Sequence, residues 1–220
     1  MKRYAIKEIF RTLQGEGFHA GRLAVFVRFT GCNVWSGREQ DRQLASEKGV
    51  CALWCDTDFR GTNGEQGGKY TADELVEVIK ATWSSPGHPF VVVTGGEPTL
   101  QWDEELCAAF QDANFFTAME TNGSANLEHC RPDWVTLSPK PPMPVVVHQF
   151  IVVDEVKVVY PVQGLDPEEC FRYSSRHYLQ PVDAGDVALN ASFVGDCIAY
   201  IEHHPKWQLS LQTHKIIGVP

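Results

Sequence analysis

Four consecutive apolar residues at positions 90–93 lead directly into the polar sequence Thr94-Gly95-Gly96-Glu97-Pro98. A short continuous apolar run is typical of a strand in a parallel sheet that is covered on both faces. Just upstream, Thr71-Ala72-Asp73-Glu74 forms a capping box, which opens a helix that ends near Trp83. The chain therefore enters this strand from a helix, as the crossover connections of a parallel sheet require.

The same order of strand, polar motif and helix recurs along the chain. Helical patterns lie at about 71–83, 103–113 and 191–203, and strand-like apolar runs lie at 23–29, 90–93, 115–119, 134–137, 152–159, 178–179 and 207–211. This alternation predicts an α/β fold built on a parallel sheet or barrel, with residues 1–220 in a single domain. Since the polar motifs follow the strands, we expect the functional site at the carboxyl ends of the strands.

Three of the seven cysteines, Cys32, Cys51 and Cys55, lie close together directly after the strand-like run at 23–29. Thiolates select iron–sulfur clusters, zinc or copper(I) over hard cations. A structural zinc site is normally closed by a fourth ligand, and neither a fourth cysteine nor a suitably spaced histidine lies nearby. The trio therefore indicates a metal site with one open position, carried by a polar loop insert at about 33–50.

The composition restricts the partners of the chain. Its formal net charge is −9 and it has no run rich in lysine and arginine, whereas nucleic-acid-binding proteins usually carry a basic stripe. We therefore expect a small-molecule substrate and no nucleic acid. The sequence has no apolar stretch of about 18 residues and no signal-peptide pattern, so we expect a cytoplasmic protein with no membrane partner.

Charged residues inside apolar runs need an explanation of their own. Arg28 interrupts the run at 23–29, and it either pairs with a carboxylate of the fold or projects into a cavity to bind an anion. Asp154, Glu155 and Lys157 interrupt the run at 152–159, and we expect them on the exposed face of their strand. The loop at 13–17 places two glycines around a carboxylate, and both a surface turn and a ligand-binding loop fit this pattern.

Taken together, the motifs resemble the radical S-adenosylmethionine superfamily and, within it, the 7-carboxy-7-deazaguanine synthase family. The resembling segments span nearly the whole chain in the family's order: Leu13–Gly17, Arg28, Cys32-Asn33, Cys55-Asp56-Thr57, Thr94–Pro98, Glu120–Gly123, Ser138–Lys140, Gln180-Pro181 and Pro220. The long gap between Cys32 and Cys51 resembles a variant within this family, whereas three residues between Cys51 and Cys55 depart from the usual two. The resemblance implies a modified partial (β/α) barrel with about six mainly parallel strands and three main helices.

The resemblance also implies the ligands and their contacts. Cys32, Cys51 and Cys55 would hold a 4Fe–4S cluster whose fourth iron binds S-adenosylmethionine, and Thr57 would bind Mg²⁺. The implied cofactor contacts are Asp56, Gly96, Glu97, Ser138, Pro139, Lys140, Gln180, Pro181, Val182 and Asp183. The implied substrate contacts are Leu13, Gln14, Gly15, Glu16, Arg28, Thr94, His214 and Pro220. No side chain is expected to be catalytic beyond the cluster and the cofactor.

The implied reaction converts 6-carboxy-5,6,7,8-tetrahydropterin to 7-carboxy-7-deazaguanine with release of ammonia. A one-electron reductase such as flavodoxin or ferredoxin and a second copy of the chain in a homodimer are the implied protein partners. Two other functions stay open at this point. One is a small radical enzyme that places a glycyl radical on a partner protein, and the other is a non-catalytic metal-binding module.

Overall fold

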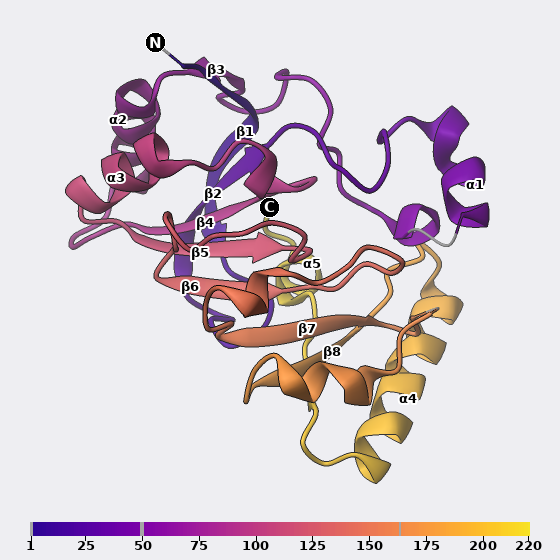
Figure 1. Cartoon of the computed structure of the whole chain (residues 1–220). Coiled ribbons are helices and arrows are strands. Elements are labelled where there is room, and N and C mark those ends of the chain that lie inside the picture. Colours follow the sequence, from indigo (N-terminus) through magenta and orange to yellow (C-terminus); the bar gives the residue numbers. More distant parts are fainter. Residues whose placement is uncertain (1, 49–50, 163) are drawn as a thin grey trace.

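The computed structural model describes residues 2–48, 51–162 and 164–220, except for the side chains of Cys51 and Ala52. In this part of the chain, nine strands form one sheet in the order β3-β1-β2-β4-β5-β6-β7-β8-β9 (Figure 1). The strands are β1 (Tyr4–Leu13), β2 (Leu23–Phe29), β3 (Gly68–Tyr70), β4 (Phe90–Gly95), β5 (Phe116–Thr121), β6 (Trp134–Leu137), β7 (Glu155–Tyr160), β8 (His177–Pro181) and β9 (Gln208–Leu209).

Every neighbouring pair from β2 to β9 is parallel, whereas β1 runs antiparallel to both β2 and β3. The sheet is open because its order ends at β3 and β9, so it forms a partial barrel. The predicted α/β class is therefore confirmed. The antiparallel strands β1 and β3 were not anticipated, since the sequence before Leu13 shows no clear alternation and β3 has only three residues.

The helices are α1 (Glu39–Glu47), α2 (Ala72–Trp83), α3 (Glu104–Asp112), α4 (Val187–His203) and α5 (Thr213–Ile217). The three predicted helices correspond to α2, α3 and α4, and the capping box at Thr71 is present as expected. Helix α1 forms within the insert, and a short 3₁₀ helix follows it at Cys51–Trp54. None of the described helices is long and apolar enough to span a bilayer.

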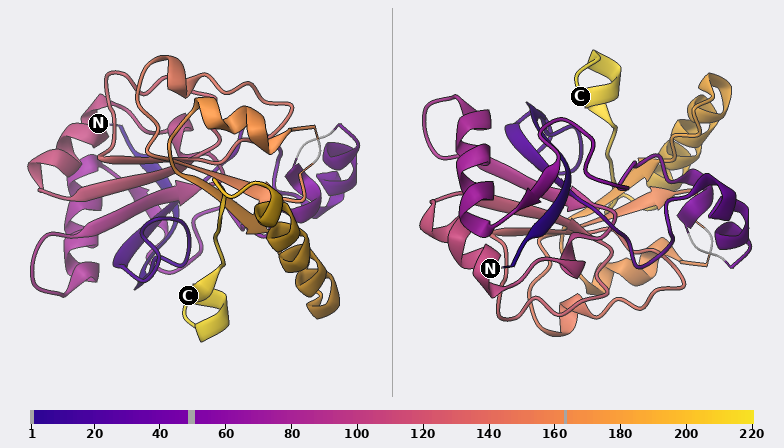
Figure 2. Two further views of the ribbon diagram at one scale, coloured as in Figure 1. Left: turned by 90° about the horizontal axis from the view of Figure 1, so that it is seen from below. Right: turned by 90° about the horizontal axis from the view of Figure 1, so that it is seen from above.

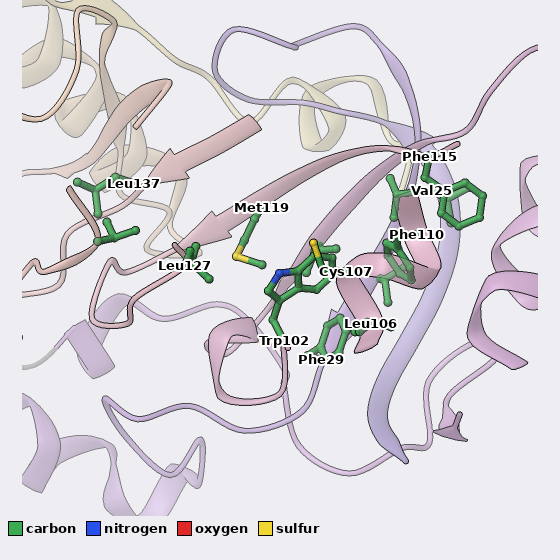
Figure 3. Packing of buried hydrophobic residues seen from close by; sticks show 14 of the residues in the cluster. Val25, Phe29, Trp102, Leu106, Cys107, Phe110, Phe115, Met119, Leu127 and Leu137 are labelled. Carbon is green, nitrogen blue, oxygen red and sulfur yellow. The ribbon is translucent and has the colours of Figure 1, made fainter. Parts of the chain in front are cut away.

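Alternation along the strands separates the two faces of the sheet. On the outer face, Val25 and Phe29 of β2 pack against Leu106 and Phe110 of α3, all of them buried (Figure 3). Helix α2 lies beside α3 on this face (Figure 1), and α4 covers the strands at the other end of the sheet. The alternate residues of the same strands point to the inner face.

Aromatic rings close the inner face where the parallel strands begin. His19, from the loop between β1 and β2, contacts Phe90, Phe116 and Trp134, which are the first residues of β4, β5 and β6. The guanidinium of Arg22 lies 3.9 Å from the centre of the Phe90 ring, a distance typical of a cation–π contact. This packing closes the amino ends of the strands and leaves the carboxyl ends for the site.

Candidate active site

A cavity of about 560 Å³ lies against the inner face of the sheet, within the range usual for small-molecule sites. Its lining combines the strand ends, the segment around the cysteines and the C-terminal segment. Most of the predicted site residues line it: Leu13, Gln14, Glu16, Arg28, Cys32, Cys55, Asp56, Thr57, Thr94, Gly96, Ser138, Pro139, Lys140, Gln180, Val182, His214 and Pro220.

Five predicted site residues are not among the lining residues. Gly15, Glu97, Pro181 and Asp183 lie just outside the cavity, and the side chain of Cys51 lies outside the described part of the structure. The backbone of Cys51 begins the 3₁₀ helix that ends directly before Cys55. The roles of these residues stay predictions.

The cysteine loop (residues 32–58) carries two described thiols into the cavity, those of Cys32 and Cys55. The Cys32 sulfur accepts a hydrogen bond of 3.4 Å from the Val34 N–H. Burial raises the pKa of the Cys32 thiol, so bare protein does not favour its thiolate. A bound cation would supply the missing stabilisation, because metal coordination deprotonates a thiol.

The glycine pair lies directly against the start of the cysteine loop. A Cβ on Gly96 would lie 2.2 Å from the Gly31 oxygen and 2.7 Å from the Cys32 Cβ, so only glycine fits there. Among the described side chains, which do not include that of Cys51, no three histidine, cysteine or acidic groups form a ready metal site. Cys32 beside the glycine pair, Cys55 in the same cavity and Cys51 one short turn before Cys55 fit a cluster bound by three cysteines.

Glu97 lies just behind the cavity lining, and its side chain organises the neighbouring strand end. Its residue is only 1% exposed, and its Oε1 accepts from the Thr99 hydroxyl at 2.6 Å and the Thr121 hydroxyl at 2.7 Å. Its Oε2 accepts from the Asn122 N–H at 2.8 Å. The carboxylate thus links the end of β4 to the end of β5, where Thr121 and Asn122 line the cavity.

A buried ion triad lies across the cavity from the cysteine loop. The Lys157 ammonium donates to a Glu16 carboxylate oxygen and to Glu120 Oε2, the latter at 2.9 Å. Glu155, two residues earlier on β7, accepts from the Thr136 hydroxyl at 2.8 Å and from the Phe18 N–H at 2.8 Å. The expectation that Glu155 and Lys157 are exposed was wrong, since they are 2% and 4% exposed.

The two carboxylates of the triad have opposite electrostatic environments. Burial raises the pKa of Glu120, and the neighbouring charge of Glu16 adds to this effect while Lys157 offsets it only in part. For Glu16, burial also opposes ionisation, but Lys157 and a hydrogen bond from Gln212 outweigh it and lower its pKa to about 2. Burial opposes the charge on Lys157 as well, yet its two carboxylate partners raise its pKa. Glu16 and Lys157 are therefore a buried ion pair, and Glu120 is the group closest to protonation.

Residues along a strand face the two sides of the sheet alternately, and this alternation is the sequence signal that could have identified Glu120, Glu155 and Lys157. Arg28 of β2 is in register with Thr94 of β4, and Glu120 of β5 is in register with Thr136 of β6. Thr136 is in turn in register with Glu155 of β7, and Lys157 lies two residues further along that strand. Polar residues of this parity all face inward, so reading the parity of 152–159 against 134–137 would have placed Lys157 in the site.

Arg28 pairs with a carboxylate of the fold and also lines the cavity. Its Nε donates to Glu8 Oε1 at 2.7 Å, and both residues line the cavity. A bond through Nε keeps the plane of the guanidinium fixed, and a bidentate anion can then pair with the two terminal nitrogens. The binding of an anion by Arg28 stays a prediction.

The end of the cysteine loop is held by two lysines from other elements. Asp58 Oδ2 accepts from Lys7 of β1 at 2.6 Å, and Asp56 Oδ2 accepts from Lys215 of α5 at 2.6 Å. Thr57 lies between these two aspartates and lines the cavity. Neither lysine is near the loop in the sequence, so sequence reasoning had no signal for either contact.

The chain is similar to characterised proteins along its whole length. It is 47% identical to the 7-carboxy-7-deazaguanine synthase of Caulobacter vibrioides over 220 residues, covering 99% of both chains. It is also 47% identical to the enzyme of that name from Burkholderia multivorans, again covering 99% of both chains. No family model matches the chain.

A solved structure shares the fold. The crystal structure of QueE from Escherichia coli matches with a TM-score of 0.68 at 26% identity, over 95% of this chain and 93% of that one. The partial barrel with thiols and a glycine pair at its carboxyl end defines a radical S-adenosylmethionine enzyme. The chain belongs to the 7-carboxy-7-deazaguanine synthase family, as its relatives show. It is thus an enzyme of queuosine-precursor biosynthesis, and neither the activase nor the metal-binding module is supported.

Proposed function

We propose that this chain converts 6-carboxy-5,6,7,8-tetrahydropterin to 7-carboxy-7-deazaguanine with release of ammonia. One observation carries the proposal: a single cavity combines the thiols of Cys32 and Cys55 with Arg28 and the Glu16–Lys157–Glu120 triad. The first group suits an iron–sulfur cluster, and the second suits a polar bicyclic acid. The names of the relatives support the same reaction. Residues 1–220 act as one domain, with the insert at about 33–50 serving the cluster.

Cys32, Cys51 and Cys55 would hold the 4Fe–4S cluster, and residues at the strand ends would hold S-adenosylmethionine. When bound, these groups supply one-electron chemistry that removes a hydrogen atom from the substrate. The protein orients the cofactor and excludes water. The Gly96 backbone would hold the methionine end, and the other proposed cofactor contacts are Asp56, Glu97, Ser138, Pro139, Lys140, Gln180, Pro181, Val182 and Asp183.

The substrate binds with its carboxylate on the Arg28 guanidinium, whose orientation Glu8 fixes. The amino-pyrimidinone edge of a pterin presents N–H donors, and the carboxylates of Glu16 and Glu120 are the acceptors that face the cavity. Lys157 balances the charge of one carboxylate, and the raised pKa of Glu120 reduces the charge of the other, so the site repels an anionic substrate less. Leu13, Gln14, Gly15, Thr94, His214 and Pro220 complete the substrate contacts.

Thr57 would hold Mg²⁺ through its hydroxyl oxygen, a hard ligand of the kind that this ion prefers. The aspartates on either side already pair with Lys7 and Lys215, so a single hard oxygen from the loop fits the small number of protein ligands that Mg²⁺ usually takes. A Thr57→Ala variant should shift the magnesium titration of turnover to higher concentration, and an unchanged titration would rule out this ligand.

The chain works in the cytoplasm with a one-electron reductase such as flavodoxin or ferredoxin, since the cluster needs a low-potential electron. It acts as a homodimer. Exposed apolar side chains on α4 and α5 support this proposal: Val187 is 88% and Ile216 is 70% exposed, and both helices project from the same side of the sheet (Figure 2). Sedimentation equilibrium of the anaerobic enzyme should give twice the mass of the chain, and a monomer would contradict it.

Turnover by Arg28 variants tests the proposed function. Wild-type protein, reconstituted with iron and sulfide without oxygen, should form 7-carboxy-7-deazaguanine from the carboxypterin. Arg28→Ala should lower kcat/KM on the order of 100-fold, the scale of removing one partner of a buried charged contact, while iron content stays unchanged. Arg11→Ala is the matched control, because Arg11 lies on β1 outside the cavity and donates to Ser84. No product from iron-loaded wild type would contradict the proposal.

A further inference from the structure

Lys215 pairs with two carboxylates at the rim of the cavity. Its ammonium donates to Asp56 Oδ2 at 2.6 Å and to Asp183 Oδ2 at 2.5 Å. Asp56 directly follows Cys55, and Asp183 comes two residues after the end of β8. Lys215 belongs to α5, in the C-terminal segment. One side chain thus joins three segments that are far apart in the sequence.

The C-terminal segment (residues 212–220) has further contacts with β1 and with the loop that follows β1. The Thr213 N–H and hydroxyl both donate to the Gly15 oxygen, at 3.1 and 2.8 Å, and Gln212 donates to Glu16 at 3.1 Å. The Thr12 hydroxyl donates to a Pro220 oxygen at 2.7 Å. These contacts attach the segment to β1 and its loop, whereas Lys215 attaches it to the cysteine loop and β8.

The start of the C-terminal segment packs closely on the loop after β1, which leaves it little room for movement. A Cβ on Gly15 would lie 2.0 Å from His214 Nδ1, so the imidazole lies directly over the glycine. The exposed Ile216 and Ile217 on the other side of α5 have no comparable packing in the described structure. The segment is therefore attached to β1 and its loop at both ends, at Thr213 and Pro220, and Lys215 links α5 between them to the cysteine loop.

We infer that Lys215 is a positioning residue that holds the C-terminal segment, the cysteine loop and the end of β8 together across the cavity rim. Without the Lys215 ammonium, no cation would lie between the carboxylates of Asp56 and Asp183. Two like charges that lie close together repel each other. The loop that carries Cys55 and Thr57 would then separate from the segment that carries His214 and Pro220. The inference rests on the proposed function for its catalytic consequence, but not for its structural one.

The structural consequence is tested on metal-free protein by amide hydrogen exchange. In Lys215→Ala, the amides of α5 and of residues 55–58 should exchange about tenfold faster, the scale of one or two charge-assisted hydrogen bonds. Lys215→Arg keeps the charge and should restore most of the protection. Lys80→Ala removes a more exposed ion pair with Glu77 on α2, outside the cavity lining, and should leave these amides unchanged.

The catalytic consequence is tested by the coupling of cofactor cleavage to product formation. Since S-adenosylmethionine is regenerated in the proposed reaction, wild type should form little 5′-deoxyadenosine per product. Lys215→Ala should raise this ratio several-fold and raise KM for the carboxypterin more than it lowers kcat, with rescue by Lys215→Arg. A purely structural role would lower kcat through loss of folded protein and leave the ratio unchanged.

The exchange and turnover experiments together distinguish the role of Lys215 from the proposed function. Unchanged exchange and an unchanged ratio in Lys215→Ala would overturn the role of Lys215 while wild-type turnover still supports the function. Failure of wild type to form product would overturn the function, and faster exchange in the same variant would still support the role of Lys215 in holding the rim. An equal increase in amide exchange in Lys80→Ala would also overturn the role of Lys215, because the faster exchange would then reflect a general loss of stability.

Discussion

Two regions face the same cavity but are stabilised in different ways. The inner wall consists of polar groups on the inner face of paired strands, together with Glu16 from the neighbouring loop. Thr136, Glu155 and Lys157 are buried, Glu120 and Glu16 are partly buried, and Glu16, Glu120 and Lys157 line the cavity. The cysteine loop carries α1, a helix without a buried residue, and its described core is one small cluster around Trp35 and Phe59. Strand pairing fixes the first region, whereas ion pairs at its rim hold the second.

This difference indicates a division of roles around the cavity. A wall whose hydrogen bonds are already satisfied pays no reorganisation cost when a substrate binds, which is the basis of preorganised sites. A loop with few buried contacts belongs to the low-stability part of a protein, and it can gain order from the cluster it binds. We therefore expect the wall to be rigid before any ligand binds and the loop to become ordered with its metal.

The largest effect is expected at the centre of the wall. Lys157→Met leaves two buried carboxylates without their cation, and it should lower the free energy of unfolding by about 3–5 kcal/mol, as is usual when one partner of a buried pair is removed. Urea denaturation of metal-free protein measures the change. A loss below about 1 kcal/mol would mean that the triad behaves like a surface ion pair and would remove the contrast between the regions.

The pH dependence of stability gives the next effect. The pKa of Glu16 is lowered to about 2 in the folded protein, so its ionised form stabilises the fold above its ordinary pKa. That contribution is lost as the pH falls from about 5 towards 2. The raised pKa of Glu120 acts in the opposite direction, with stabilisation present at low pH and lost as the pH rises through its folded value. Glu16→Gln should flatten the acid side of the unfolding curve by about 2–3 kcal/mol, and an equally steep curve would contradict the assignment.

A smaller loss is expected where the wall meets the glycine pair. Glu97→Gln places an amide N–H₂ against groups that donate to Glu97, which are Thr99, Thr121 and the Asn122 N–H. An unsatisfied buried donor costs about 1–3 kcal/mol, and thermal unfolding measures it. An unchanged midpoint would show that the site relaxes around the amide.

The smallest effect is expected in the cysteine loop. Leu44 of α1 is 55% exposed, and Leu44→Ala should change the free energy of unfolding by no more than about 0.5 kcal/mol, as is typical of surface substitutions. Urea denaturation under the conditions used for Lys157→Met provides the comparison. A loss above about 2 kcal/mol would show that α1 is part of a packed core, and the two regions would no longer differ.

Local sequence signals predicted much of the fold and of the site. The apolar runs and the capping box at Thr71 indicated the parallel strands and helix α2, because each depends on residues that are neighbours in the chain. The motifs around Cys32 and Gly96 indicated the end of the sheet that carries the site. Most of the predicted contacts then lie in one cavity.

Contacts between distant segments could not be predicted in the same way. Lys157 was expected to be exposed because charged residues usually are, and its burial depends on carboxylates at Glu16 and Glu120 that only the folded chain brings near. Lys7 and Lys215 likewise meet the cysteine loop through tertiary structure alone. Helix α5, with five residues, is too short for a periodic pattern to reveal.

The most direct measurement follows the hydrogen atom at C6 of the substrate. Iron-loaded enzyme is reduced without oxygen in the presence of S-adenosylmethionine and carboxytetrahydropterin that carries deuterium at C6. If the thiols and the wall act on one substrate in one cavity, deuterium should appear in the recovered S-adenosylmethionine or 5′-deoxyadenosine while 7-carboxy-7-deazaguanine forms. Product without any transfer of deuterium, or cofactor cleavage that never labels either compound, would contradict the account.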